Sequence, residues 1–156
     1  MEYIQEAKDG PEDAACVLCR IREGEEDERV LTRSGLGYVV LNRFPYTPGH
    51  LVVVPNRHVG ELEALDDEES IDLQRLLRRS VVALRHEYGP QGFNIGMNLG
   101  RVAGAGIPDH LHWHVVPRWG GDTSFMPVIG ETMVLPELVD ESARRLAPRF
   151  AAVDEG

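Results

Sequence analysis

The sequence has no long apolar run: none of its windows approaches the 18 consecutive apolar residues that a membrane-spanning helix needs. Its first 19 residues, MEYIQEAKDGPEDAACVLC, show neither the basic nor the apolar region of a secretory signal. We therefore expect a cytoplasmic protein that contacts no membrane. Apolar residues still make up 42% of the 156 residues, which is enough to build a folded core.

Basic residues are scarce, and Lys8 is the only lysine. The chain has 16 Lys and Arg against 26 Asp and Glu, which gives a formal net charge of -10. This balance disfavours a nucleic-acid polymer as partner, because such binding depends on neutralising phosphates. The acids are concentrated in residues 1–30 and 61–72, whereas residues 31–60 carry three arginines and no acid. A small anionic ligand is therefore compatible with the middle of the chain.

Cysteine occurs only twice, at Cys16 and Cys19, in a C-x-x-C pattern. Structural disulfides are rare in the cytosol, so a disulfide is a poor interpretation of this pair. The spacing instead favours metal binding or redox chemistry.

The apolar patterns predict an α+β fold with a mostly antiparallel sheet of about five strands. Short β-favouring runs flank Ser34-Gly35 and predict a hairpin there. Residues 50–55 form an apolar run that is typical of a strand covered on both faces. Further strands are expected over residues 93–99, with Gly96 as either a bulge or a site of close approach, and over residues 111–117. Residues 1–13 are expected to be a flexible arm before a single domain, residues 14–156.

A long helix is predicted to begin after Asp66 or Asp67 and to end at Gly89-Pro90. Its apolar residues recur at steps of three and four and form one buried stripe: Leu73, Leu77, Val81, Leu84 and Tyr88. A weaker helical pattern over residues 136–153 directs four residues toward the core: Leu138, Ala143, Leu146 and Phe150.

Three histidines alternate with apolar residues in the segment His110-Leu111-His112-Trp113-His114. Alternate residues of a strand share a face, so the imidazoles are expected on one side and Trp113 on the other, toward the core or a partner chain. A plain solvent-facing strand and a three-histidine zinc site are alternatives. One ion suits the pattern poorly, because the outer histidines lie about 13 Å apart along a strand and zinc–nitrogen bonds are about 2 Å. The third interpretation is that the middle histidine reacts and its neighbours assist.

The segment HLHWHVV, residues 110–116, resembles the H-φ-H-φ-H-φ-φ signature of the histidine triad (HIT) family of nucleotidyl hydrolases and transferases. Residues 42–55, 92–106 and 116–126 also resemble that family, and the likeness covers about residues 14–130. It implies a HIT-like fold with one long helix and a C-terminal helix. It also implies a homodimer that binds a small nucleotide or dinucleotide and uses no organic cofactor.

The resemblance implies a role for each matching residue. His112 takes the position of the nucleophile that attacks the α-phosphorus of a nucleotide, and imidazole suits this role as a good nucleophile and a tolerable leaving group. His114 takes the position that assists the leaving group. Asn42 matches a ribose-binding position, Asn98 a phosphate-binding position, and His50 a position that lines the pocket behind the triad.

One stretch departs from the family pattern. Many members have Gly-Gln-Ser or Gly-Gln-Thr before the triad, where this chain has Ala105-Gly106-Ile107. Backbone N–H groups of the glycine-rich turn, at Gly104 and Gly106, are expected to bind phosphate in place of the missing side chains. Arg101 and Arg118 are further candidates.

Some members of the family hold a structural zinc ion, and the resemblance implies its ligands here: Cys16, Cys19, His58 and His110. Such a Cys₂His₂ set leaves no open position on the ion, so the site would be structural. The alternative interpretation is a pair of reduced, half-buried thiols beside a surface histidine.

The sequence therefore predicts an enzyme that cleaves a dinucleoside polyphosphate, such as diadenosine tetraphosphate, at an α-phosphate through a nucleotidyl-His112 intermediate. Water as acceptor makes it a hydrolase and inorganic phosphate a phosphorylase. Phosphorylases of this chemistry often have glutamine at the third triad position, so His114 favours hydrolysis without excluding phosphorolysis. A nucleoside phosphoramidase and a non-catalytic nucleotide-binding regulator remain as alternatives.

Overall fold

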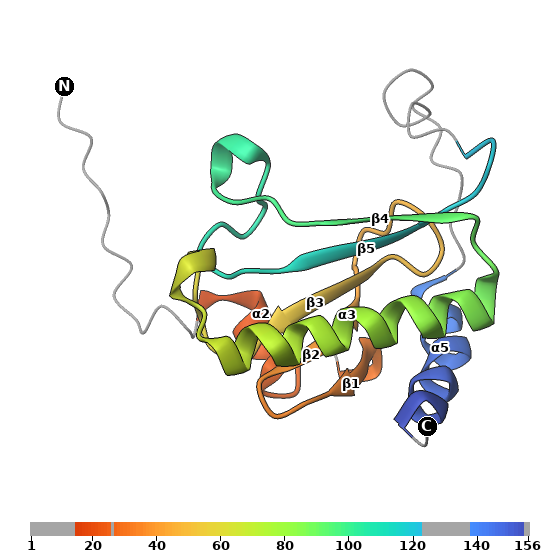
Figure 1. Cartoon of the computed structure of the whole chain (residues 1–156), viewed down its shortest axis with the longest axis horizontal. Coiled ribbons are helices and arrows are strands. Elements are labelled where there is room, and N and C mark those ends of the chain that lie inside the picture. The colour runs from red at the N-terminus through yellow and green to blue at the C-terminus, as the bar shows by residue number, and fades with distance from the viewer. Residues whose placement is uncertain (1–14, 26, 123–137, 155–156) are drawn as a thin grey trace, which may run out of the picture.

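Five strands form one sheet in the order β1-β2-β3-β5-β4, and every neighbouring pair is antiparallel. The computed structural model describes residues 15–25, 27–122 and 138–154 (Figure 1). The predicted α+β class is confirmed, whereas the expected arm, residues 1–13, lies outside the described residues. The strands are β1 (Val30–Arg33), β2 (Gly37–Leu41), β3 (Leu51–Pro55), β4 (Gly92–Gly96) and β5 (Trp113–Arg118).

The predicted hairpin is confirmed, since β1 and β2 pair on either side of Ser34-Gly35. Strand β3 lies between β2 and β5, and all five of its residues are buried. The uninterrupted apolar run thus corresponds to a strand covered on both faces, as predicted.

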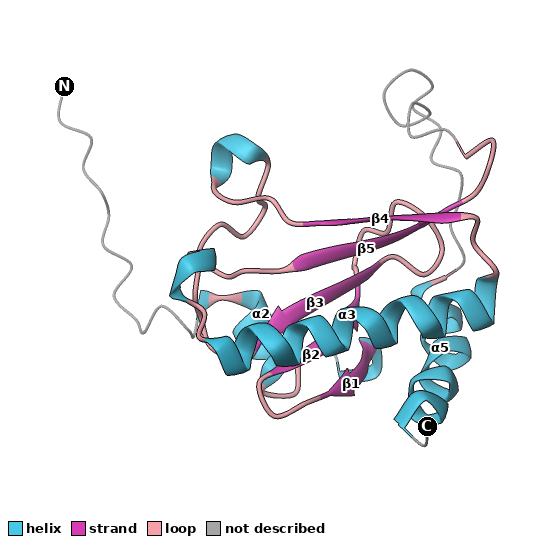
Figure 2. Ribbon diagram, in the orientation of Figure 1, coloured by secondary structure: helices cyan, strands magenta, loops and turns pink. Residues whose placement is uncertain are grey.

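Helix α3 (Asp67–Tyr88) crosses one face of the sheet (Figures 1 and 2). It begins with a capping box, in which the Asp66 carboxylate accepts from the Glu69 N–H and the Glu69 carboxylate accepts from the Asp66 N–H. It ends at Gly89, whose φ of 54° is left-handed. The predicted stripe packs on the inward residues of the strands in one apolar core that includes Val39, Val53, Val115, Leu73 and Leu84.

The opposite face of the sheet carries α2 (Val17–Arg22), a six-residue helix that the sequence patterns did not predict. Together with Cys16, α2 packs on residues of β2 and β3 that alternate with the first core: Tyr38, Val40, Val52 and Val54. His114 is in register with Val52, so its side chain lies on this same face. The α2 side of the sheet therefore holds the triad, and α3 covers the other side.

Helix α5 (Val139–Asp154) packs against α3 and β1. Leu146 and Phe150 are fully buried and Ala143 packs on the same core, as predicted. Leu138 was predicted wrongly: it precedes the helix and is 76% exposed. No helix in the described part of the chain is long and apolar enough to cross a membrane.

Two predicted strand boundaries need correction. Strand β4 ends at Gly96, which pairs with His114 without a bulge. Strand β5 begins at Trp113, so His110 and His112 precede it, outside the sheet. The reason is local pairing, because the Leu111 N–H donates to the Val59 carbonyl at 2.7 Å rather than to a neighbouring strand.

Candidate functional site

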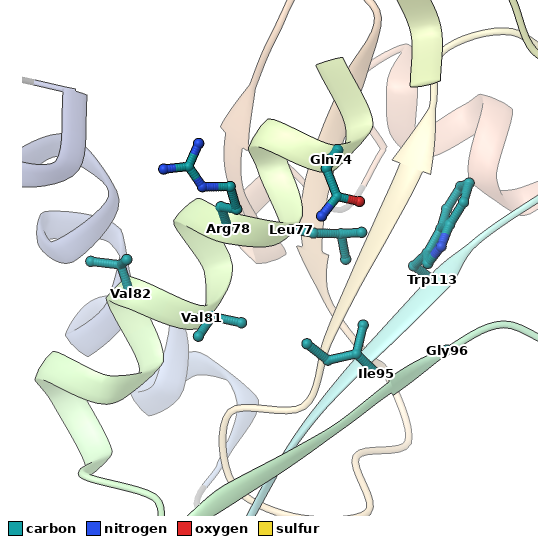
Figure 3. Close-up of a pocket in the computed structure, with 8 residues that line it drawn as sticks. All are labelled: Gln74, Leu77, Arg78, Val81, Val82, Ile95, Gly96 and Trp113. Atoms are coloured by element: carbon teal, nitrogen blue, oxygen red, sulfur yellow. The ribbon is translucent and has the colours of Figure 1, made fainter. Parts of the chain in front are cut away.

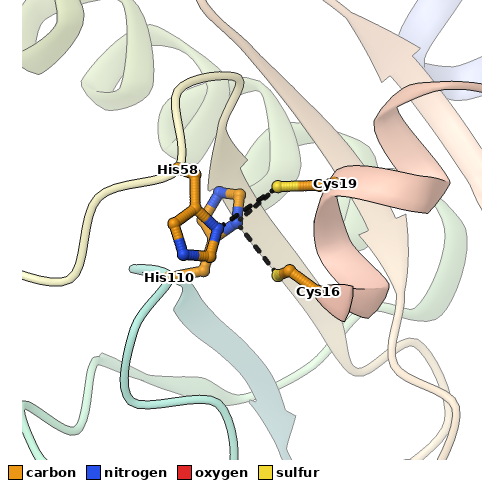
Figure 4. Close-up of side chains that lie close together, drawn as sticks. All are labelled: Cys16, Cys19, His58 and His110. Carbon is orange, nitrogen blue, oxygen red and sulfur yellow. Dashed lines mark hydrogen bonds between the residues drawn. The ribbon is translucent and has the colours of Figure 1, made fainter. Parts of the chain in front are cut away.

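Four potential metal ligands from three separate segments converge beside the sheet (Figure 4). Cys16 precedes α2, Cys19 lies within it, His58 follows β3, and His110 precedes β5. Their ligand atoms all lie within 4.8 Å of one another. Sγ of Cys19 is 3.3 Å from Nδ1 of His58, and Nδ1 of His110 is 3.4 Å from Sγ of Cys16 and 3.5 Å from Sγ of Cys19.

The main chain fixes the orientation of His110. Its Nε2 lies 2.9 Å from the carbonyl of Pro55, which can only accept, so Nε2 carries the proton and Nδ1 directs a lone pair at the sulfurs. Burial lowers the pKa of His110 to about 4, which keeps the imidazole in its ligating form at neutral pH. Gly60 permits the close approach of the two histidine segments, because a Cβ there would lie 2.9 Å from the carbonyl oxygen of Pro108.

This arrangement fits zinc. Zinc–sulfur bonds of about 2.3 Å and zinc–nitrogen bonds of about 2.0–2.1 Å place tetrahedral ligand atoms about 3.5 Å apart. The three sulfur–nitrogen separations given above, 3.3 to 3.5 Å, match that value. Both cysteines are free thiols and are buried. The four residues predicted together are thus brought together, and they can bind a metal ion.

His112 is held by a different main-chain contact. Its Nδ1 lies 2.9 Å from the carbonyl oxygen of His110, so Nδ1 carries the proton and donates it to that carbonyl. In the neutral ring Nε2 then has the free lone pair. The His110 residue therefore serves two groups: its side chain faces the cysteines, and its carbonyl sets the tautomer of His112.

His114 has the opposite tautomer. The backbone N–H of Tyr46 donates to Nδ1 of His50 at 3.1 Å, which leaves the proton of His50 on Nε2. That proton is donated to Nδ1 of His114 at 2.9 Å, so His114 carries its own proton on Nε2. Burial, with His114 nearby, lowers the pKa of His50 to about 3, and burial followed by the charge of His112 lowers the pKa of His114. Both rings are neutral at pH 7.

The rings of His112 and His114 are neighbours, with centroids 5.2 Å apart. One presents a lone pair at Nε2 and the other presents an N–H at Nε2. A nucleophile thus lies beside a hydrogen-bond donor, an arrangement that suits displacement at a phosphorus atom, where negative charge builds up on the leaving oxygen.

A groove of about 260 Å³ opens beside His114, between the 42–50 loop and β4. Asn98, predicted to bind phosphate, lies in this groove, which is lined by Tyr46, Asn94, Ile95, Gly96, Asn98, His114 and Val116. Asn42 lies behind it, with its Nδ2 atom 3.3 Å from both ring nitrogens of His50. The structure thus connects Asn42, His50 and His114 into one row of contacts.

The glycine-rich turn differs from what was expected. The N–H of Gly104 donates to the Arg101 carbonyl at 3.0 Å, and that of Ala105 donates to the Gly100 carbonyl at 3.2 Å. Gly104 therefore offers its carbonyl to Asn98 and has no N–H left for a phosphate. The N–H of Gly106 has no partner among the described residues, so only the second of the two predicted glycines keeps its donor.

Two residues of this groove were missed by the sequence analysis. Asn94 shares a face with Gly96 by strand alternation, and its register opposite Val116 places it on the histidine side of the sheet. That alternation was a usable signal for Asn94. Tyr46, in the 42–50 loop, is 75% exposed, and its ring centroid lies 4.7 Å from that of His50. No sequence pattern pointed to it.

A second groove, of about 450 Å³, lies on the opposite face between α3 and the edge strand β4. Figure 3 shows Leu77 and Val81 of α3 facing Ile95 and Trp113 of the sheet. Trp113 is in register with Val53, on the face away from the histidines, as predicted.

Comparisons with known proteins agree with this site. A model of the HIT domain matches residues 23–121, so the chain belongs to the HIT family. It is 43% identical over 157 residues to the AP-4-A phosphorylase of Mycobacterium tuberculosis, covering 97% of this chain and 80% of that protein. It is 30% identical over 104 residues to the adenosine 5'-monophosphoramidase hnt1 of Schizosaccharomyces pombe, covering 67% and 74%.

A solved structure shows the same fold. The Zn-bound histidine triad family protein from Mycobacterium smegmatis superposes with a TM-score of 0.75 at 27% identity, covering 92% of this chain and 98% of that one. The recognition of the family from the motif HLHWHVV and its flanks is confirmed by both kinds of comparison.

Proposed function

We propose that this protein cleaves dinucleoside polyphosphates, such as diadenosine tetraphosphate, at an α-phosphate through a covalent nucleotidyl-His112 intermediate. The observation that carries the proposal is the opposite tautomers of two neighbouring imidazoles, a lone pair on Nε2 of His112 and an N–H on Nε2 of His114. A metal-binding or purely structural role would not require this pairing.

In the first step, Nε2 of His112 attacks the α-phosphorus and forms a P–N bond as the P–O bond to the leaving nucleotide breaks. The leaving oxygen takes up the electron pair and accepts a hydrogen bond from the N–H at Nε2 of His114, which stabilises its negative charge. Because His112 is held by a main-chain carbonyl and His114 by His50, neither ring has to reorient before it reacts.

In the second step, an acceptor attacks the same phosphorus and the P–N bond breaks, returning the electron pair to Nε2 of His112. A water molecule that acts as the acceptor releases its proton to the solvent, and the N–H at Nε2 of His114 keeps its hydrogen bond to the reacting phosphate. Asn42 would bind the ribose of the transferred nucleotide, next to His50. Asn98 and the N–H of Gly106 would bind phosphate oxygens.

The acceptor is the open choice between water and inorganic phosphate. The AP-4-A phosphorylase relative supports phosphate, and the histidine at the third triad position supports water. The phosphoramidase relative supports a second candidate, cleavage of a nucleoside phosphoramidate by the same two steps. A regulator that binds nucleotide without turnover is the third candidate. The presence of both reacting imidazoles, His112 and His114, disfavours it.

The proposal includes a structural zinc ion held by Cys16, Cys19, His58 and His110. When bound, the ion would supply a cross-link between α2 and the chain that leads into β5, without an open position for chemistry. The solved Zn-bound family member supports this part of the proposal.

A homodimer and a cytoplasmic location also remain parts of the proposal. Strand β4 is an edge strand, and the apolar groove beside it contains Val82 and Ile95, which are 38% and 48% exposed. A second copy would cover this surface and pair the edge. The two free thiols suit a reducing compartment.

Product analysis tests the proposed activity. Diadenosine tetraphosphate is incubated with the protein, with and without inorganic phosphate. AMP plus ATP identifies a hydrolase, whereas two molecules of ADP, formed only with phosphate, identify a phosphorylase. Binding of the dinucleotide without any product would overturn the proposed enzymatic function.

A further inference from the structure

Asn94 lies at the end of the groove that leads away from His114. It is in register with Val116, two positions along β4 from Gly96, which is in register with His114. Residues two apart in a strand are separated by about 6.6 Å, a distance that a short chain of linked phosphates can span. Gly96 has no side chain, and nothing lies within 4 Å of where its Cβ would be. The floor of the groove is therefore open between the two side chains.

The amide of Asn94 is held in one orientation by an arginine. Nη1 of Arg118 donates to Oδ1 of Asn94 at 2.6 Å, so the amide cannot flip without losing this bond. The two hydrogens on Nδ2 are then its remaining donors. Within the described residues Nδ2 has no hydrogen-bond partner, and Asn94 lines the groove.

Arg118 is in turn fixed by Asp122. Its Nε and Nη2 donate to the two carboxylate oxygens at 2.7 and 2.8 Å, and the carboxylate also accepts from the backbone N–H of Trp119 at 3.1 Å. The guanidinium charge is thereby balanced by a carboxylate, and its remaining nitrogen, Nη1, donates to Asn94. At this end the groove therefore offers the neutral amide of Asn94 as a donor in a fixed orientation, and the guanidinium of Arg118 is held in place by Asp122.

The geometry of displacement at phosphorus indicates what would bind at the Asn94 end of the groove. A leaving group departs opposite the attacking nitrogen, and the acceptor of the second step enters from the direction that the leaving group has vacated. The N–H at Nε2 of His114 donates a hydrogen bond to the leaving oxygen, so the leaving chain of phosphates begins beside His114. The open floor beyond His114 extends toward Asn94.

We propose that Asn94, positioned by Arg118, binds the phosphate chain of the leaving nucleotide and, in the second step, an incoming inorganic phosphate. This inference rests on the proposed function and adds to it a residue that selects for substrates with phosphate on the leaving side. A nucleoside phosphoramidate, whose leaving group is ammonia, has nothing to place there and makes no use of Asn94.

The test compares two substrates of the full chain: diadenosine tetraphosphate and adenosine 5'-phosphoramidate. Asn94→Ala is expected to lower kcat/KM for the dinucleotide by about 10- to 100-fold, the scale of one hydrogen bond to a charged group. The same variant should change kcat/KM for the phosphoramidate by less than about twofold. Asn94→Asp keeps the acceptor for Arg118 but adds negative charge, so its loss on the dinucleotide should be larger still.

Arg75→Ala is the matched control. Arg75 is exposed on α3, beyond the opposite face of the sheet, and its removal tests whether any lost donor or positive charge weakens the reaction. It should leave both substrates unchanged. Equal losses of both substrates in Asn94→Ala, or no loss of either in Asn94→Asp, would overturn the role of Asn94 and leave the proposed activity standing. A wild-type chain that cleaves neither substrate would overturn both.

Discussion

Nε2 of His50 lies 2.9 Å from Nδ1 of His114, and this contact determines which nitrogen of His114 carries a proton. His50 is fully buried and its other nitrogen is occupied by the N–H of Tyr46. In this hydrogen bond, therefore, His50 is the donor and His114 is the acceptor. His50 touches no substrate in the proposed mechanism, yet it makes Nε2 of His114 the hydrogen-bond donor at the reacting phosphate.

His50→Gln should reduce the acid sensitivity of folding. The pKa of His50 is about 3 in the folded chain against an ordinary 6.5, so between these values the unfolded chain binds a proton that the folded chain does not. The contribution of the neutral His50 ring to the free energy of unfolding is fully present above pH 6.5 and is lost as the pH falls toward 3. The contribution lost between pH 6.5 and 5 is about 2 kcal/mol.

Urea unfolding at pH 7 and pH 5 measures this difference. The glutamine variant can still donate an amide hydrogen to Nδ1 of His114 but cannot titrate, so it should lose about 2 kcal/mol less than the wild-type chain over this interval. Equal losses in the two proteins would show that His50 titrates normally in the folded state.

Cys19→Ser should remove zinc. Cys19 is fully buried, and its sulfur lies near the imidazoles of both His58 and His110. The purified wild-type chain should hold about one equivalent of zinc, and the variant less than a tenth, with a lowered Tm because the ion cross-links α2 to the chain before β5. The matched control is Ser80→Ala, a buried hydroxyl on α3 that bonds the Leu76 carbonyl. Zinc below a tenth of an equivalent in untreated wild-type protein would refute the metal site.

Gly49→Ala should destabilise the chain by about 2–5 kcal/mol. Gly49 has a φ of +78°, and a Cβ there would lie 2.8 Å from Cδ2 of Leu84 and 3.0 Å from Cε2 of Tyr88. The left-handed conformation costs about 1–2 kcal/mol and the overpacking about 1–3 kcal/mol. Because Gly49 directly precedes His50, activity should fall with stability. In Gly35→Ala, where nothing lies within 4 Å of the new Cβ, the free energy of unfolding measured in urea should stay within about 0.5 kcal/mol.

The elements that the sequence predicted well are those whose signals are local. The alternation around Ser34-Gly35 and the repeat in α3 span many residues, and each is closed by a recognisable turn or cap. Helix α2 has only six residues, which is too short for a periodic signal, and its packing on Tyr38 comes from the tertiary structure. The start of β5 depends on the contact between Leu111 and Val59, which no local pattern contains.

The residues of the candidate site also fall into two groups: those that a sequence motif identifies, and those whose contacts depend on the tertiary structure. The metal ligands and the triad histidines were identified because their spacing in the sequence resembles the motif of the HIT family. Asn94 depends on Arg118, which lies 24 positions away and approaches it only through the pairing of β4 with β5. The use of the Gly104 N–H within its own turn is likewise a matter of backbone geometry. Contacts of this kind become visible only in three dimensions.

The central claim is that His112 forms a covalent bond to the transferred nucleotide. Wild-type protein is mixed with radiolabelled diadenosine tetraphosphate in the absence of inorganic phosphate, quenched in alkali to preserve the P–N bond, and digested for peptide mass spectrometry. We predict an adenylyl group on His112 that forms within one turnover and disappears on further reaction, and we predict that His112→Ala loses both the adduct and at least about 10³-fold of the turnover. Turnover without an adduct, in a chain whose His112→Ala variant keeps more than about a tenth of the activity, would contradict the account.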